Sequence, residues 1–206
     1  LVGGTMLYYK ALLEGLNKLP EANADIRAVI EAKAHAQGWP AIHAELAKVD
    51  PVCAARLKPT DKQRLQRALE VYKSSGKALS AFHADEASGG LLADESIGVL
   101  QLAVSPLERK ELHRRIAARF DVMIAQGFVE EVKALAVRHD LTPNTPALRA
   151  VGYRQLMAHI NGQETLDEAV EKGIIATRQL AKRQLTWLRG WQNLMWLHTD
   201  ESGQQV

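Results

Sequence analysis

The amino-acid sequence predicts an α/β protein that is mostly helical, with a small sheet and an all-α insert. Apolar residues recur at spacings of three and four through most of the 206 residues, which is the period of an amphipathic helix. Strand patterns are confined to Ile97–Val104 and to the stretches near Leu1 and Trp196. After Pro20 the composition changes to small, Ala-rich helices that extend to about Gly76, which indicates the insert.

The first half of the chain predicts one core helix and the borders of the insert. Met6 to Glu14 has the pattern of a short helix that ends at Gly15. We expect residues 80–96 to form a loose return linker, after which the strand Ile97–Val104 rejoins the sheet begun by Leu1-Val2. The predicted domains are therefore a core made of 1–17 and 96–206 and an insert made of 18–95.

Three helices are predicted in the second half of the chain. Ser105-Pro106-Leu107-Glu108 has the pattern of a capping box with proline at the first helical position, and Gly127 would end that helix. Thr145-Pro146 would start another. Thr165-Leu166-Asp167-Glu168 is a second capping box, and the long helix that it opens would run towards Trp191.

The charge balance, the cysteine count and the hydropathy of the sequence favour a protein of a reducing cytoplasm. The 26 basic and 24 acidic residues leave a formal charge of +2, so an anionic partner would have to meet a local patch. A lone cysteine, Cys53, cannot form an internal disulfide, and the sequence has neither a long apolar run nor a basic leader. Leu1-Val2 resembles the end of a strand without preceding neighbours, so we expect an N-terminal part of the sheet to be missing from this chain.

The Gly3-Gly4-Thr5 turn lies where a predicted strand gives way to a helix. It combines backbone that a ligand can approach closely, a hydroxyl group and the positive end of a helix dipole. Such a turn suits an anion or a polar substrate. Glycines at this kind of turn also serve tight geometry alone, and the turn by itself does not decide between the two.

Arg119 lies at the edge of the apolar face of the helix 106–126. That face contains Leu112, Ile116, Phe120 and Met123, so we expect the guanidinium to be partly inside. It would then either extend to water or have an anionic partner. In contrast, a solvated face is expected for three other cations of this helix: Arg109, Arg114 and Arg115.

Two further segments carry clustered cations. Gln63, Arg64 and Arg67 lie near the start of the helix 61–76 without a nearby acid, which suits phosphate binding but also an ordinary surface. In the segment 178–191, basic residues and aromatic residues occupy opposite faces, which is compatible with a nucleic-acid contact and also with an amphipathic core helix. The histidines lack the spacing of metal ligands, and no metal site is predicted.

Four separated segments match one known family: LVGGTMLYYKALLEG at 1–15, QRLQRALEV at 63–71, VGYRQ at 151–155 and KRQLTWLRGW at 182–191. Together they resemble bacterial tRNA dimethylallyltransferases, over essentially the whole chain and in the same order. The resemblance implies a P-loop nucleotide-kinase-like core, lacking its N-terminal strands in this chain, and an all-α insert that grips the anticodon stem of tRNA.

The resemblance also implies a reaction. The exocyclic amine of a flipped-out adenosine, 3′-adjacent to the anticodon, would attack dimethylallyl diphosphate, and diphosphate would leave with help from a phosphate loop, Mg²⁺ and an arginine. Arg119 matches that arginine, and Thr5 matches a threonine near the amine, with Gly3 and Gly4 as substrate-binding neighbours. In the family the phosphate loop and the proton-accepting aspartate precede the position of Leu1. We therefore expect this chain, as it stands, to be inactive. The resemblance separately implies a monomer.

The tRNA contacts implied by the resemblance fall into four groups. They are Arg27; Gln63, Arg64, Leu65, Gln66 and Arg67; Ala150, Val151, Gly152, Tyr153, Arg154 and Gln155; and Lys182, Arg183, Gln184, Leu185, Thr186, Trp187, Leu188 and Arg189.

Two other functions compete with this one. An RNA-binding module without catalysis would use Lys182, Arg183 and Arg189 but would leave Arg119 and the glycine turn without a role. An enzyme that prenylates free adenine nucleotides would have no stem to grip, so the helical insert argues against it.

Overall fold

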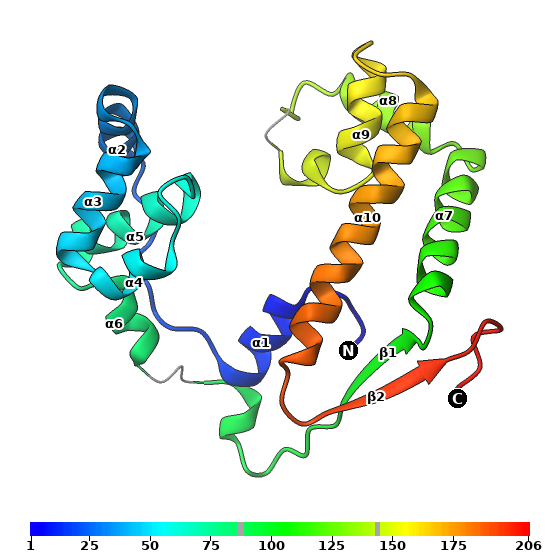
Figure 1. The fold of residues 1–206 in the computed structure, drawn as a ribbon, viewed down its shortest axis with the longest axis horizontal. Coiled ribbons are helices and arrows are strands. Elements are labelled where there is room, and N and C mark those ends of the chain that lie inside the picture. Colours follow the sequence, from blue (N-terminus) through cyan, green and yellow to red (C-terminus); the bar gives the residue numbers. More distant parts are fainter. Residues whose placement is uncertain (86–88, 143–144) are drawn as a thin grey trace. The chain divides into compact units, whose positions relative to one another are not determined.

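The computed structural model describes residues 1–85, 89–142 and 145–206, and this part of the chain is mostly helical with a two-stranded parallel sheet (Figure 1). The elements in chain order are α1 (Met6–Glu14), α2 (Ala24–Gln37), α3 (Trp39–Val49), α4 (Pro51–Arg56), α5 (Lys62–Ser75), α6 (Leu79–Ala84), the 3₁₀ turn η1 (Leu91–Ala93), β1 (Gln101–Pro106), α7 (Arg109–Ala125), α8 (Phe128–Ala136), the 3₁₀ turn η2 (Pro146–Arg149), α9 (Tyr153–Ile160), α10 (Leu166–Arg189) and β2 (Leu194–Thr199).

The described residues form two compact units. One unit contains Leu1–Met6 and Leu100–Val206, and the other, the helical unit, contains Leu7–Val99. The α1 helix, beyond Met6, therefore belongs to the helical unit, whereas residues 1–17 were expected to belong to the core. The expected linker 80–96 includes α6 and η1, and its residues 86–88 lie outside the described part.

The sheet contains the strand predicted near Trp196, and this strand is the partner of β1 in place of the expected Leu1-Val2. β1 pairs in parallel with β2, from Gln101 opposite Leu194 to Pro106 opposite Thr199. The prediction that the strand starts at Ile97 is wrong, because the Ile97 N–H donates to the Asp94 carbonyl in a turn. Leu1 and Val2, expected in the same sheet, are fully exposed and form no strand among the described residues.

The predicted capping box at Ser105–Glu108 is also wrong. Ser105 and Pro106 are the last residues of β1, and the Leu107 N–H extends the ladder to the Thr199 carbonyl at 3.0 Å. The cross-strand pairing thus takes up these residues, and α7 begins only at Arg109 without a side-chain cap. Gly127 does separate α7 from α8, since its φ of 93° suits glycine in the left-handed region.

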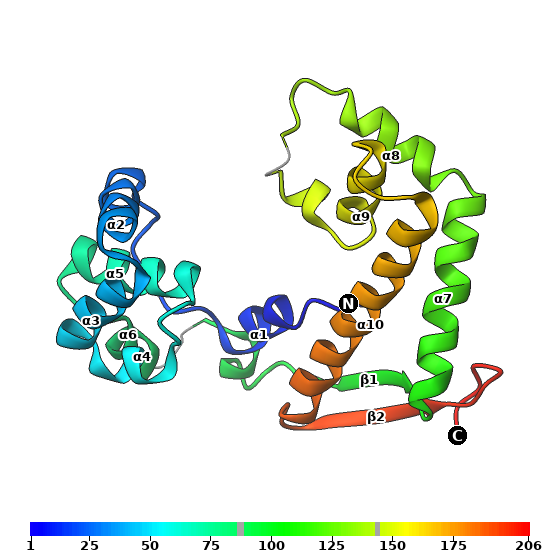
Figure 2. The ribbon, with the colours of Figure 1, turned by 45° about the horizontal axis from the view of Figure 1, so that its top comes forward.

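The predicted capping box of α10 is confirmed. Thr165 Oγ1 accepts a hydrogen bond from the Glu168 N–H at 3.2 Å, and Glu168 Oε2 accepts one from the Thr165 N–H at 2.8 Å. α10 and α7 pack against each other, with the strands at one end of the pair and α8 and α9 at the other (Figures 1 and 2). The chain thus crosses over from β1 to the parallel β2 through helices, as parallel pairing requires.

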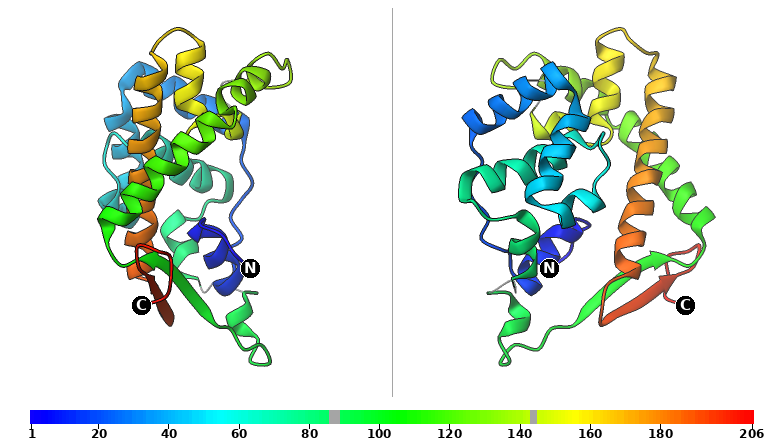
Figure 3. Two further views of the ribbon diagram at one scale, coloured as in Figure 1. Left: turned by 90° about the vertical axis from the view of Figure 1, so that its right-hand side faces the viewer. Right: turned by 60° about the vertical axis from the view of Figure 1, so that its left-hand side comes forward.

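Each unit has its own apolar core. The core of the helical unit is formed by Ile30, Ala34, Ile42, Leu46, Ala54, Leu65, Ala68 and Leu69. The core of the other unit, where α7, α8, α9 and α10 meet, is formed by Phe120, Phe128, Val129, Val132, Leu156 and Ala169 (Figure 3). Within the described residues, no helix has the length and apolar content needed to cross a membrane.

Gly173 sets how closely α7 and α10 approach. A Cβ atom at this position would lie 2.3 Å from Phe120 Cζ, and both residues are buried. We predict that Gly173→Ala lowers the free energy of unfolding by about 1–3 kcal/mol, because the Phe120 ring must move. Because alanine gains roughly 1 kcal/mol within a helix, a net loss requires the ring movement to cost more than that gain, and the 2.3 Å approach to Phe120 Cζ places the cost in the upper part of the range.

Urea unfolding of the variant checks this expectation. Gly98→Ala is the matched control, because no atom lies within 4 Å of the added Cβ atom. Equal stability of Gly173→Ala and the wild-type chain would contradict the proposed packing.

Candidate functional site

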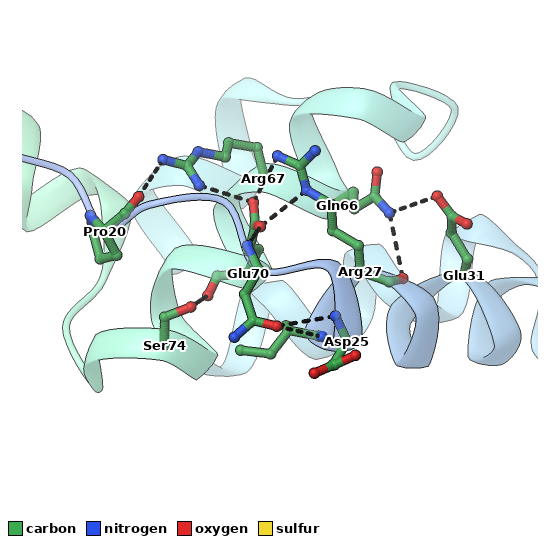
Figure 4. Close-up of polar contacts among 10 residues, drawn as sticks. Pro20, Asp25, Arg27, Glu31, Gln66, Arg67, Glu70 and Ser74 are labelled. Carbon is green, nitrogen blue, oxygen red and sulfur yellow. Dashed lines mark hydrogen bonds and ion pairs between the residues drawn. The ribbon is translucent and has the colours of Figure 1, made fainter.

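A buried carboxylate joins α2 to α5 in the helical unit. Glu70 Oε1 accepts hydrogen bonds from the Asn23 N–H at 2.7 Å and from Arg27 Nε at 2.9 Å, and Oε2 accepts from Arg27 Nη2 at 3.1 Å and Arg67 Nη1 at 2.9 Å (Figure 4). Arg67 Nη2 also donates to the Pro20 carbonyl at 2.8 Å. We call Arg27, Arg67 and Glu70 the arginine cluster.

The carboxylate of the arginine cluster stays charged although it is buried. Burial raises the pKa of Glu70, but the hydrogen bonds from Arg27, Arg67 and the Asn23 N–H outweigh burial and lower this pKa to about 2. Four donors match the four acceptor positions of a carboxylate, so the group is fully satisfied. The cluster is therefore a permanent ion pair at neutral pH.

The expectation that the start of α5 lacks a nearby acid is wrong. Arg67 pairs with Glu70, and Arg64 lies 3.3 Å from Asp61, which also caps the helix. Leu65, included in the expected RNA-contacting run, is fully buried in the core and supports its neighbours instead of facing solvent. Gln66 is bound by Glu31 and the Arg27 carbonyl, while Gln63 and Arg64 are exposed.

The C-terminal half of α10 presents a basic surface. Gln179, Lys182, Arg183, Thr186 and Trp187 line an open depression. The two tryptophans of this segment differ. Trp187 is 45% exposed, whereas Trp191 donates from Nε1 to Gln101 Oε1 at 2.6 Å. Arg189 is also exposed, whereas Leu185 and Leu188 are half-buried.

The Gly3-Gly4-Thr5 turn is tied to α10. Gln184 Nε2 donates to the Gly4 carbonyl at 2.7 Å, and a Cβ atom on residue 4 would lie 2.5 Å from that nitrogen. A side chain at residue 4 would therefore displace the end of the Gln184 side chain and with it this hydrogen bond. Thr5 is exposed immediately before α1, so its hydroxyl faces solvent next to a helix N-terminus.

Arg119 is exposed, so the expectation that it is partly inside is wrong. The buried acid of α7 is instead Glu111, which binds two arginines expected to be free: Arg114 and Arg115, with contacts of 2.7 Å. The hydrogen bonds from Arg114 and Arg115 lower the pKa of Glu111 to about 2. Arg115 also donates to the Asp200 carbonyl, which fixes the turn after β2 to α7.

The run Ala150–Gln155 is partly structural. Gly152 has a φ of 95°, and its N–H donates to the buried Gln155 Oε1 at 2.9 Å. The Tyr153 hydroxyl donates to Glu131, and its ring meets Phe128 edge-on. Ala150 and Arg154 are exposed, and Val151 is half-buried.

Each of the four basic or glycine-rich segments therefore keeps an exposed donor side chain: Thr5, Arg64, Arg154 and Lys182 are examples. Sequence reasoning missed Glu70, which binds Arg67 at the start of α5, and Gln184, which binds the glycine turn. It also missed Glu111, which binds Arg114 and Arg115 of α7. The spacing of Arg67 and Glu70 by three residues was a local signal, but the partner Arg27 lies 43 residues away in the sequence. In the described ranges, no group of three or more His, Cys, Asp or Glu side chains could hold a metal ion.

Comparisons with known proteins match the part of the chain that contains these segments. Residues 1–191 match the family model described as IPP transferase. A tRNA isopentenylpyrophosphate transferase from Bacillus halodurans is 31% identical, with a TM-score of 0.56 over 97% of this chain and 58% of that chain. One from Staphylococcus epidermidis is 29% identical, with a TM-score of 0.50 over 98% of this chain and 63% of that chain.

A eukaryotic dimethylallyltransferase that acts on tRNA has the same fold, with a TM-score of 0.72 at 23% identity over 97% of this chain and 50% of that chain. The chain thus spans between one half and two thirds of the length of these relatives. The family match covers nearly the whole sequence and includes each of the segments described above. This chain belongs to the IPP transferase family.

Proposed function

We propose that this chain is part of a tRNA dimethylallyltransferase. The observation that carries the proposal is the match of residues 1–191 to the IPP transferase family, within which the glycine turn and the basic segments occur in one order. The substrates would be dimethylallyl diphosphate and the anticodon stem-loop of a tRNA, and the target would be the adenosine 3′-adjacent to the anticodon. The enzyme would act in the cytoplasm as a monomer.

In the proposed reaction the adenosine leaves the base stack, because its amine is otherwise out of reach. The amine nitrogen forms a bond to the allylic carbon, the bond from that carbon to the diphosphate oxygen breaks, and the amine loses one proton to a base. Family resemblance gives the base role to an aspartate outside these 206 residues. Arg119 would stabilise the charge of the leaving diphosphate, and Thr5 would position the amine.

Mg²⁺ would accompany the diphosphate, as the family resemblance implies, since this ion is usually held by one or two carboxylates together with substrate phosphates. The described residues contain no group of three or more His, Cys, Asp or Glu side chains that could hold it alone. The family resemblance also supports a P-loop nucleotide-kinase-like core as part of this proposal, although the 206 residues themselves contain no GxxxxGK[ST] pattern.

We predict that the 206-residue chain alone transfers no dimethylallyl group. A phosphate loop would stabilise the leaving diphosphate, and this chain has none. The measurement is transfer of label from dimethylallyl diphosphate to an anticodon stem-loop, by this chain and by the chain extended upstream with its native coding sequence. Transfer by the short chain would refute this prediction. Binding without transfer by both forms would favour an RNA-binding module.

Arg119→Ala in the extended form should lower the transfer rate by about a hundredfold or more, as expected when one donor to a developing anion is removed. Lys110→Ala is the control, because Lys110 is an exposed cation on the same helix. Steady-state rates at saturating stem-loop measure the effect. A similar rate for both variants would remove Arg119 from the chemistry.

Lys182 and Arg183 are predicted to contact tRNA phosphates. Replacing both by alanine should weaken stem-loop binding and flatten its logarithmic salt dependence by roughly 0.7 to 0.9 for each phosphate that is no longer neutralised. Lys172→Ala is the matched control on α10, because Lys172 is already paired with Glu164 at 2.7 Å. If the double variant keeps the wild-type salt slope, this face of α10 does not meet the RNA.

A further inference from the structure

We propose that Glu70 is a positioning residue, which holds the guanidinium groups of Arg27 and Arg67 as a fixed pair for phosphate groups of the tRNA backbone. The inference rests on the proposed function and deepens it. Glu70 itself would touch no RNA, because its side chain is fully buried.

The arginine cluster has an anionic inner side and a cationic outer side. The Glu70 side chain is 0% exposed, whereas the side chains of Arg27 and Arg67 are 43% and 30% exposed. Each guanidinium has five N–H donors, of which two are used by the hydrogen bonds of Figure 4. Three donors on each group therefore remain for a ligand within the described structure, and both groups reach the surface.

Stability alone does not explain this arrangement. A buried ion pair often contributes no more to stability than apolar residues of the same volume. It does fix geometry, since the fork of Arg27 meets both carboxylate oxygens and Arg67 is held at two points. Because a free arginine loses side-chain entropy when it binds a phosphate, fixing two of them in advance strengthens binding.

The helical unit contains a second acid between two cations, which provides a matched control. Glu45 lies 2.7 Å from Lys33 and 2.8 Å from Lys73, and its side chain is 23% exposed. Both clusters thus hold one carboxylate and two cations from different helices. They differ in that Glu45 is accessible to water and its partners are flexible ammonium groups instead of planar forks.

Positioning and simple charge attraction predict opposite changes in RNA affinity for Glu70→Gln. This change removes one negative charge, so attraction alone would strengthen binding to a polyanion. An amide can accept hydrogen bonds through only one of its two polar atoms, so glutamine would release at least one guanidinium. If position matters, binding therefore weakens although the local charge becomes more positive.

The test is stem-loop binding by fluorescence anisotropy, with the 206-residue wild-type chain, Glu70→Gln and Glu45→Gln. Circular dichroism first identifies a temperature at which all three are folded. We expect Glu70→Gln to weaken binding by about tenfold, the scale of one charged hydrogen bond, and to flatten the salt slope by the amount of roughly one neutralised phosphate. Glu45→Gln should bind at least as tightly as the wild-type chain.

Unchanged or tighter binding by Glu70→Gln would overturn the positioning role while leaving the proposed function intact. An equal loss in Glu45→Gln would also overturn it, because the effect would then be a general loss of structure. Absence of wild-type binding would refute both the positioning role and the RNA contact of this chain.

If Glu70→Gln does not fold, the double variant Arg27→Lys and Arg67→Lys tests the same positioning role. It keeps both positive charges and leaves Glu70 paired, but it removes the forked geometry. Positioning predicts a loss of roughly tenfold in affinity, comparable to one charged hydrogen bond. Binding equal to that of the wild-type chain would overturn the proposal.

Discussion

The ion pairs of Glu70 are the constraint on which the helical unit depends. This carboxylate binds the backbone at the start of α2, an arginine on the first turn of α2 and an arginine on its own helix, α5. A buried charge is tolerated only when it is fully paired, so α2 and α5 have one relative position in which Glu70 is satisfied. The apolar core beneath them, including Ile30 and Leu65, is compatible with that position.

The α10 helix has the corresponding role in the other unit. Its buried Gly173 contacts Phe120 of α7, Gln184 binds the Gly4 carbonyl, and the chain beyond its end is anchored by Trp191 on Gln101. The same helix leaves Lys182, Arg183 and Trp187 accessible to a partner along one side. One face of α10 thus packs against the rest of the unit, while another face presents cations to solvent. Both packing and cation exposure constrain the sequence of this helix.

Local sequence signals predicted the ends of helices well where no long-range pairing competed with them. Gly15 and Gly76 end helices, and Thr165 with Glu168 caps α10, because each depends on residues within one helical turn. The same kind of signal failed at Ser105, where pairing with β2 competes with helix formation. Helical periodicity placed Arg119 at an apolar edge but could not show that its side chain turns to solvent.

The candidate functional segments were predictable from their residue types, but the buried acids that bind their arginines and those of α7 were not. Glu70 was hidden because its two arginines come from separate helices, and Glu111 because it binds two arginines that a single helix pattern assigns to solvent. An ion pair with a buried acid is costly to break, because it would leave a buried charge unpaired, whereas an ion pair between exposed groups contributes little to stability. Such pairs become visible only once the fold brings the helices together.

Arginine footprinting with phenylglyoxal tests most directly whether the exposed cations of both units contact tRNA. Bound anticodon stem-loop should protect Arg64 of the helical unit, which is exposed in the free chain, and Arg183 of α10, which lines the open depression. Arg138, also exposed but paired with Asp140, should react equally with and without RNA. Protection confined to one unit, or equal protection of Arg138, would contradict contact of the RNA with both the helical unit and α10.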